Sequence, residues 1–421
     1  MKLIEMPHGI LDLMHRISER VTPTQTQRAH QILSRFFADI LQPLEDSTVF
    51  VMTGDIPAMW LRDSTWQAMP LVGASKEITT YNLLAAISRR QSAYVCIDPY
   101  ANAFNPAPTQ KDESKEFDGQ SPWVFERKYE LDSLAAFLDL ALRLARVSGR
   151  NEHLQGQFVE AVEKVIEVIS TEQHHDFDSY KLSREGNPLH DYLSHNGRGA
   201  PVGYTGMSWS GFRPSDDACV FGYHIPSNAY ASLVLQQLSE LNESVFPYAV
   251  LKERARILSV QIKSGIEAFG VVEIDGESIW AYEVDGLGNR VLMDDANLPS
   301  LLSLPLLGWC DADDVRYQAT RKFILSLENP YFYQGLVAQG IGSIHTPSNR
   351  VWPIALAIEA ITSGSTSHMQ STLQLLENTD AGTGNMHESF DVNDPTKFSR
   401  EWFSWADMTY LLLLLKSVKL A

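Results

Sequence analysis

Apolar residues recur at three- and four-residue spacing along most of this chain, which is the pattern of amphipathic helices. One series runs from Ala29 to Leu41, and another from Leu131 to Ala145, before a plausible stop signal at Gly149. Similar series cover Phe158 to Ile169, Tyr230 to Leu241, Leu251 to Phe269, Val315 to Leu327, Ile354 to Ile361 and Met408 to Leu415. Alternating strand patterns are scarce, and only a short hairpin is predicted, from Val271 to Glu283 around Asp275-Gly276. The sequence therefore predicts an all-α fold.

Between these helical series lie segments rich in glycine, proline, aromatic residues and carboxylates. Six are marked: Val49 to Trp66, Cys96 to Tyr129, Asp191 to Asn228, Trp280 to Pro299, Asn329 to Pro353 and Ala381 to Trp405. Their even spacing suggests a closed ring of helical hairpins, an (α/α)6 barrel, in which alternate loops gather at one rim. No Ser/Gly-rich linker interrupts the series, so we expect a single domain over residues 1–421. Two ordinary helical domains are the alternative.

Eight of the nine tryptophans fall inside these six segments. Loops normally lie at the surface, so bulky apolar rings there need an explanation. A sugar presents apolar C–H faces that stack on indole, while its hydroxyl groups bond to polar neighbours. The alternative for any single tryptophan is that it packs its loop onto the barrel. For the set as a whole, a saccharide pocket is the better interpretation.

Charge and cysteine content narrow the possible partners and location. The formal net charge is −18, and no run of Lys or Arg is present, so a nucleic-acid partner is not expected. The three cysteines, Cys96, Cys219 and Cys310, form no CxxC pair, which favours a reducing compartment. No stretch approaches the roughly 20 apolar residues of a membrane span, and Met1 to Met14 lacks the apolar centre of a signal peptide. The expectation is a cytoplasmic enzyme that acts on a neutral, polyhydroxylated substrate.

Glycoside hydrolysis usually needs one carboxylic acid and one carboxylate on opposite faces of the scissile bond, so the carboxylates inside the aromatic loops are the candidates. The first lies in Met59-Trp60-Leu61-Arg62-Asp63-Ser64, preceded by Gly54-Asp55-Ile56-Pro57. Arg62 and Asp63 are suited to holding sugar hydroxyls through charge-assisted hydrogen bonds. A simple ion pair at a helix N-terminus is equally compatible with Asp63 alone.

The second candidate lies in Trp209-Ser210-Gly211-Phe212-Arg213-Pro214-Ser215-Asp216-Asp217. Paired acids beside an arginine allow one carboxylate to stay ionised while the other is pushed toward protonation, as a general acid requires. Ser215 followed by two acids is also compatible with a helix cap.

The third candidate lies in Gly382-Thr383-Gly384-Asn385-Met386-His387-Glu388-Ser389-Phe390. Its glycines permit tight backbone conformations, and Glu388 is the expected general base that polarises a water molecule. The sequence contains no HExxH motif, EF-hand loop, glycine-rich phosphate cradle or nucleophile elbow. Catalysis is therefore expected to need neither a metal nor a cofactor.

The runs GDIPAMWLRDS, GMSWSGFRPSDDAC and GTGNMHESF resemble the signatures of glycoside hydrolase family 125, the exo-α-1,6-mannosidases. WLRD alone is weak, whereas SGFRPSDD together with NMHESF is specific, and the motifs follow one another along nearly the whole chain. The resemblance implies an (α/α)6 barrel and metal-independent, inverting removal of terminal α-1,6-linked mannose from oligosaccharides.

Carried onto this chain, the resemblance implies a general acid in the Asp216–Asp217 pair, with Asp216 preferred, and a general base at Glu388. It places Arg62 and Asp63 in the pocket for the terminal mannose. We further expect substrate contacts from Trp60, Arg213, Asn228 and His345. Inversion would require the two carboxyl groups to stand roughly 6.5–9.5 Å apart, leaving room for the attacking water.

Two other kinds of protein remain open at this point. Another helical-barrel glycosidase or a phosphorylase would act on glucosides, and a phosphorylase would replace the base with a phosphate site. A non-catalytic glycan-binding protein would keep the pocket without turnover. Both carboxylate loops survive here, which favours the mannosidase.

Overall fold

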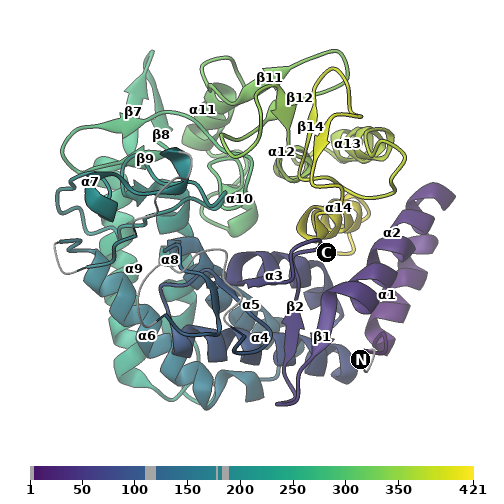
Figure 1. Cartoon of the computed structure of the whole chain (residues 1–421), viewed down its shortest axis with the longest axis horizontal. Coiled ribbons are helices and arrows are strands. Elements are labelled where there is room, and N and C mark those ends of the chain that lie inside the picture. Colours follow the sequence, from purple (N-terminus) through teal and green to yellow (C-terminus); the bar gives the residue numbers. More distant parts are fainter. Residues whose placement is uncertain (1–3, 110–119, 177–178, 183–188) are drawn as a thin grey trace.

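The chain is built mainly from helices, as the periodicity predicts (Figure 1). The computed structural model describes residues 4–109, 120–176, 179–182 and 189–421; residues 110–119 of the predicted loop from Cys96 to Tyr129 lie outside this set. Six helices form the inner ring: α3 (Leu61–Ala68), α5 (Leu131–Ser148), α8 (Ile225–Ser239), α10 (Leu304–Leu307), α12 (Pro353–Thr362) and α14 (Ser404–Ser417). Outside them lie α1 (His8–Ser18), α2 (Pro23–Arg35), α4 (Ile78–Ile97), α6 (Gln157–Glu172), α9 (Ala249–Phe269), α11 (Val315–Ile324) and α13 (Thr366–Asn378), and α7 (Ser194–Gly197) is a single turn.

The inner helices close into a ring. α3 packs on α5, α5 on α8, α8 on α10, α10 on α12, α12 on α14, and α14 packs back on α3. In Figure 1 the colours run once around this ring, so the purple N-terminal helices lie beside the yellow C-terminal ones. A backbone bridge between Gly54 and Phe403 joins the two ends of the ring at the rim. This arrangement is the predicted (α/α)6 barrel.

Burial differs between the two layers in the way the sequence dictates. α14 is buried on all sides from Ser404 to Leu415, as expected of a helix enclosed by neighbours. α6 instead buries one stripe that includes Phe158, Val162 and Ile166, and turns charged residues outward. α5 ends where Gly149 adopts φ 72°, the left-handed conformation that suits glycine at a helix C-terminus. None of the helices in the described part of the chain is both long and apolar enough to cross a bilayer.

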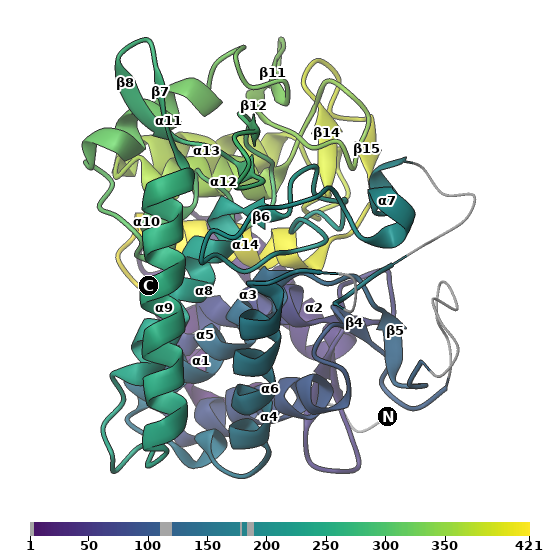
Figure 2. The ribbon, with the colours of Figure 1, turned by 90° about the vertical axis from the view of Figure 1, so that its left-hand side faces the viewer.

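Short strands occupy the loops, and Figure 2 shows β4, β5, β15 and α7 on the same side of the ring. Three of the sheets have the orders β3-β4-β5, β10-β9-β6 and β13-β14-β15, and the pairs β1-β2, β7-β8 and β11-β12 complete the set. The strands are β1 (Leu41–Pro43), β2 (Val49–Val51), β3 (Met59–Trp60), β4 (Ala103–Phe104), β5 (Val124–Glu126), β6 (Tyr223–His224), β7 (Val271–Ile274), β8 (Glu277–Trp280), β9 (Glu283–Val284), β10 (Arg290–Val291), β11 (Phe332–Gln334), β12 (Gln339–Ile341), β13 (Arg350–Val351), β14 (Ser389–Asp391) and β15 (Phe398–Ser399). β7 and β8 confirm the predicted hairpin, with Asp275 and Gly276 at positive φ in its turn.

Candidate active site

A cavity of ≈ 670 Å³ opens at the rim where α3, α12 and α14 begin. The N-terminal ends of helices carry partial positive charge, so this rim favours acidic side chains. The cavity is lined by Thr53, Ile56, Trp60, Arg62, Asp63, Glu126, Lys128, Asp191, Pro214, Ser215, Asp216, Asn297, His345, Thr346, Pro347, Trp352, Glu388, Ser399, Arg400, Phe403 and Trp405. Six of the residues predicted from sequence therefore lie together here: Trp60, Arg62, Asp63, Asp216, His345 and Glu388.

The guanidinium group of Arg62 organises one wall of the cavity. Its Nη1 lies 2.6 Å from Glu130 Oε2 and 3.3 Å from Asp132 Oδ2. Its Nη2 lies 3.3 Å from both Asp63 Oδ1 and Asp216 Oδ1. Four carboxyl groups thus surround a single cation that is itself buried, so they cannot all be ionised at low cost. This crowding separates the pKa values of neighbouring acids, as acid–base catalysis requires.

Glu130 and Asp216 respond to the crowding in opposite directions. Burial, only partly offset by Arg62, raises the pKa of Glu130 well above its usual range. Burial alone would also raise the pKa of Asp216, but a hydrogen bond from Glu130 and the charge of Arg62 outweigh it and hold that pKa below its usual range. The two opposite shifts favour Glu130 over Asp216 as the carrier of a proton in this pair.

Asp216 and Asp217 diverge because of the backbone between them. Asp216 adopts φ 67°, in the left-handed region that is uncommon for residues other than glycine. Its side chain lines the cavity and is 23% exposed. Asp217 turns away from the cavity and is 1% exposed, with Ser215 Oγ donating to its Oδ2 at 2.6 Å. Of the two acids, Asp216 is therefore the one in a position to reach a bound ligand.

Glu388 enters the cavity from a hairpin on another side. It directly precedes β14, and its backbone N–H donates to the carbonyl of Ser399 on the neighbouring chain segment. Ser399 Oγ donates to Glu388 Oε2 at 2.8 Å, and Arg400 Nη1 lies 3.6 Å from Oε1. Arg400 is held in turn by Asp55, to which its Nε donates at 3.0 Å. The hairpin thus fixes a carboxylate with one oxygen directed to a serine and the other to a cation.

Three tryptophans line the cavity: Trp60, Trp352 and Trp405. Trp405 also lies beneath the Arg62 guanidinium, 5.5 Å from its carbon. The other tryptophans of the predicted set pack against the hydrophobic core, and Trp66 does so from helix α3. Trp209, for example, is fully buried and stacks on His175 at 3.7 Å. The saccharide-pocket interpretation thus applies to three rings rather than to all eight.

Two residues predicted to contact substrate, Arg213 and Asn228, do not line the cavity. Arg213 is buried behind it, with Nε donating to Glu283 Oε1 at 2.6 Å. Asn228 lies on α8 and uses its amide within the protein, accepting from the Ser208 N–H and donating to the Ser208 carbonyl. Both residues hold the loop that carries Asp216.

Several lining residues were not predicted from the sequence, among them Arg400 and Lys128. Arg400 lies beside Glu388 only because β14 pairs with β15. Lys128 lies in the predicted loop from Cys96 to Tyr129 and contacts Asp191 at 2.6 Å and Glu126 at 3.4 Å. The position of Lys128 inside an aromatic loop indicates a role in the site, but its pairing with a residue of another loop cannot be predicted from local sequence.

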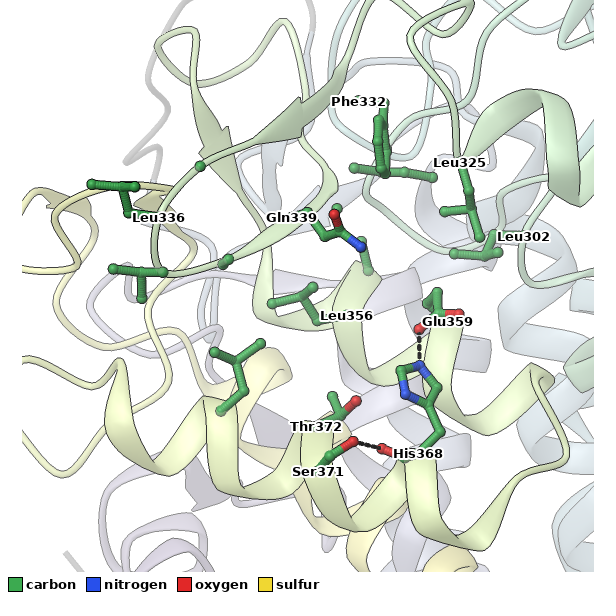
Figure 3. Close-up of a pocket in the computed structure, with 17 residues that line it drawn as sticks. Leu302, Leu325, Phe332, Leu336, Gln339, Leu356, Glu359, His368, Ser371 and Thr372 are labelled. Carbon is green, nitrogen blue, oxygen red and sulfur yellow. Dashed lines mark hydrogen bonds and ion pairs between the residues drawn. The ribbon is translucent and has the colours of Figure 1, made fainter.

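A second cavity, of ≈ 470 Å³, lies between the β11–β12 hairpin and helices α12 and α13 (Figure 3). Its wall is mostly apolar, with Leu302, Phe332 and Leu356 among its lining residues. Its ionisable lining residues, Glu359 and His368, bond to each other. It offers no opposed pair of free carboxylates and lies apart from Asp216 and Glu388.

Known proteins match the chain over almost its full length. Residues 17–415 match the family described as metal-independent α-mannosidases, glycoside hydrolase family 125. A Schizosaccharomyces pombe protein, meiotically up-regulated gene 157 protein, is 36% identical over 95% of this chain and 85% of its own length. A Streptococcus pneumoniae metal-independent α-mannosidase, solved in a non-productive complex with α-1,6-mannobiose, is 40% identical with a TM-score of 0.96, covering 99% of both chains. A more distant glycosidase, solved with glucose, shares only the fold, at 14% identity and a TM-score of 0.53 over 99% of this chain and all of its own.

Proposed function

The chain belongs to glycoside hydrolase family 125, the metal-independent α-mannosidases, and we propose that it is an exo-acting, inverting α-1,6-mannosidase with Asp216 as general acid and Glu388 as general base. The observation that carries this proposal is the presence of both carboxylates in the same cavity, on separate chain segments. The 40% identical Streptococcus pneumoniae protein, which holds α-1,6-mannobiose, supports the linkage. The match over 99% of that chain and the spread of lining residues from Thr53 to Trp405 support one catalytic domain over residues 1–421.

The proposed reaction is a single displacement. Asp216 transfers its proton to the glycosidic oxygen as the C1–O bond breaks, and the leaving sugar departs as an alcohol. Glu388 takes a proton from a water molecule whose oxygen bonds to C1 from the opposite face, which gives β-mannose. The charge that develops on the sugar ring lies near the carboxylates around Arg62. Arg62 and Asp63 bind hydroxyl groups of the terminal mannose, and Trp60 provides an apolar face.

Asp216 needs a proton to act as an acid, although Arg62 and Glu130 hold its pKa low in the unliganded site. We propose that substrate binding raises the pKa of Asp216, so that this carboxyl group takes up a proton. A sugar ring displaces water from the cavity, and burial without water disfavours the ionised form of a carboxyl group. The buried Glu130 remains beside Asp216 to keep one proton within the pair.

We also propose a cytoplasmic location and an imported or internally released oligosaccharide as substrate. Cys96, Cys219 and Cys310 are free thiols, as expected in a reducing compartment. A neutral glycan is not repelled by a net charge of −18, whereas the phosphate backbone of a nucleic acid is.

The test is proton NMR of the purified protein with α-1,6-mannobiose in the presence of a chelator. The proposal expects β-mannose as the first product, at a rate that neither chelator nor added phosphate changes. First appearance of α-mannose would mean retention and a different role for Glu388. A phosphate requirement would indicate a phosphorylase, and binding without release would indicate a glycan-binding protein.

A further inference from the structure

Asp217 has a buried oxygen that the proposed reaction leaves unexplained. Ser215 Oγ bonds to Asp217 Oδ2, but Oδ1 has no hydrogen-bond partner of good geometry among the described residues. The imidazole nitrogens nearest to Oδ1 are His345 Nδ1 at 3.5 Å and His190 Nε2 at 4.0 Å. A buried carboxylate of this kind needs a partner, and His345 is the nearer one.

A shared acidic residue holds the loops of Asp217 and His345 together. Ser215 Oγ lies 3.3 Å from Asp295 Oδ2, and Ser343 Oγ donates to the same oxygen at 3.1 Å. Ser343 Oγ also accepts the backbone N–H of His345 at 3.2 Å. Asp295 thus links the segment before Asp217 to the segment before His345, so the distance between carboxylate and imidazole is set by the fold.

The imidazole of His345 lies between Asp217 and the cavity. His345 lines the cavity and retains 35% exposure of its side chain. Because Nδ1 faces Asp217, the opposite ring nitrogen, Nε2, is left for a ligand, and no described residue bonds to it. A carboxylate on one imidazole nitrogen orients the ring and favours a proton on both nitrogens.

We propose that Asp217 is a positioning residue that holds His345 as an oriented imidazolium, whose Nε2–H donates to an oxygen of the bound mannoside. This inference rests on the proposed mannosidase function. It removes Asp217 from the candidates for the general acid and gives it a role through His345. The two adjacent acids then have different roles. Asp216 transfers a proton to the substrate, and Asp217 holds the positively charged imidazole of His345 in place.

The electrostatic surroundings of His345 agree with this role. Burial lowers the pKa of His345, but its close contact with the Asp217 carboxylate, then the charges of Glu388 and Asp216, raise it to about 9. Asp295 also acts on this histidine, and His190 is the other imidazole near Asp217. Because a third of the His345 side chain meets solvent, water will moderate the shift.

The first measurement is the NMR titration of ¹⁵N-histidine in the full chain, with His345→Gln used to assign the His345 signals. We expect His345 in the wild type to titrate near pH 9, and Asp217→Asn to move this titration at least one pH unit lower. His190→Gln is the matched control, since it removes the other imidazole near Asp217 and is expected to leave the His345 titration unchanged. If Asp217→Asn does not fold, the wild type decides alone: titration of His345 at or below about pH 6.5 overturns the proposal.

The second measurement is a double-mutant cycle on the hydrolysis of α-1,6-mannobiose. Asp217→Asn and His345→Gln should each lower kcat/KM about tenfold to a hundredfold, by analogy with groups that orient a metal-bound histidine. The double variant should be no worse than His345→Gln. A further loss in the double variant would show that Asp217 acts independently of His345, which overturns the proposal. If the wild type fails to hydrolyse the disaccharide, the proposed function falls, while the titration still tests the Asp217–His345 pair.

Discussion

Glu130 and Asp216 share the same two hydrogen-bond donors. Arg62 contacts Glu130 at 2.6 Å and Asp216 at 3.3 Å, and Asn102 Nδ2 lies 3.3 Å from Glu130 and 3.4 Å from Asp216. Two carboxyl groups that share donors in a buried site carry fewer than two negative charges, because each charge disfavours ionisation of the other group. The raised pKa of Glu130 and the lowered pKa of Asp216 favour Glu130 as the protonated member of the pair.

A neutral Glu130 makes a prediction about stability. Glu130→Gln keeps the size, the neutrality and an N–H donor toward Asp216, so its free energy of unfolding at pH 7 should fall by less than about 1 kcal/mol. Glu130→Ala removes the acceptor of Ser133 Oγ and one acceptor each of Arg62 and Asn102, and should cost about 1–3 kcal/mol for a buried donor left unpaired. Denaturant unfolding of both variants compares them directly. Equal losses would show that Glu130 is ionised in the native protein.

The same pair predicts a pH dependence with a defined sign. Because the folded-state pKa of Glu130 lies above its ordinary value of 4.5, the native state keeps a proton that the unfolded chain releases. The stability associated with Glu130 is therefore complete below pH 4.5 and is lost as the pH rises through the folded-state pKa. Glu130→Gln should make the free energy of unfolding less dependent on pH above 4.5, and unchanged slopes would contradict this assignment.

Asp63 predicts how substrate affinity changes with pH. Burial, only partly offset by Arg62, raises the pKa of Asp63 to about 6. Protonation below that pH replaces a charged acceptor with a neutral one, so binding of α-1,6-mannobiose should weaken about fivefold to tenfold as the pH falls through 6. Calorimetry in the Glu388→Gln background measures binding without turnover. Adding Asp63→Asn should weaken binding at pH 7 and remove this step, and persistence of the step would assign it to another group.

The assignment of acid and base predicts different responses to the leaving group. With α-1,6-mannobiose, Asp216→Asn and Glu388→Gln should each lower kcat on the order of a thousandfold. With α-mannosyl fluoride, whose leaving group needs little protonation, Asp216→Asn should recover most of its loss. Glu388→Gln should not recover, because water must still be activated. Steady-state rates on the two substrates measure this, and equal recovery of both variants would mean that the roles are misassigned.

Gly222 predicts a purely structural effect at the wall behind the site. A Cβ atom at this position would lie 1.9 Å from Cδ1 and Nε1 of Trp209, which is fully buried. Gly222→Ala should therefore lower the free energy of unfolding by about 1–3 kcal/mol or more. Gly73→Ala is the control, because its Cβ meets only Leu420 O at 3.9 Å and should change stability by less than about 1 kcal/mol. Similar thermal unfolding of the two variants would contradict the packing argument.

The predictable helices carry a recurring apolar series, whether they are enclosed, as α14 is, or buried on one side, as α6 is. α6 shows a clear stripe because its outer face meets solvent, and the contacts that define it are three and four residues apart. α3 lay inside a predicted loop because all eight of its residues are buried, Arg62 and Asp63 included, so no polar face marks the helix. Whether a segment such as α3 forms a helix depends on enclosure by distant parts of the chain rather than on local periodicity.

The site was predictable as a set of loops but not in its pairings. Asp216, Glu388 and Arg62 were placed by motif, and the structure brings them to one cavity. The choice between Asp216 and Asp217 depends on the backbone φ of 67° at Asp216, which the residue types of this segment do not predict. Arg400 reaches Glu388 through a strand pairing whose partners are ten residues apart in register, Ser389 with Ser399. Contacts of this kind require three-dimensional information.

The Gly54–Phe403 bridge has a consequence for how the chain folds while it is synthesised on the ribosome. Arg62 is made early, whereas Glu388, Arg400 and the Trp405 ring that lies 5.5 Å from the Arg62 guanidinium are made more than three hundred residues later. The first hairpins are synthesised with one edge of the ring open, and contacts so distant in sequence form slowly. A nascent chain that ends before Glu388 therefore lacks the proposed general base and the Trp405 side of the cavity. Hydrolysis is therefore expected only after α14 has left the ribosome and packed against α3.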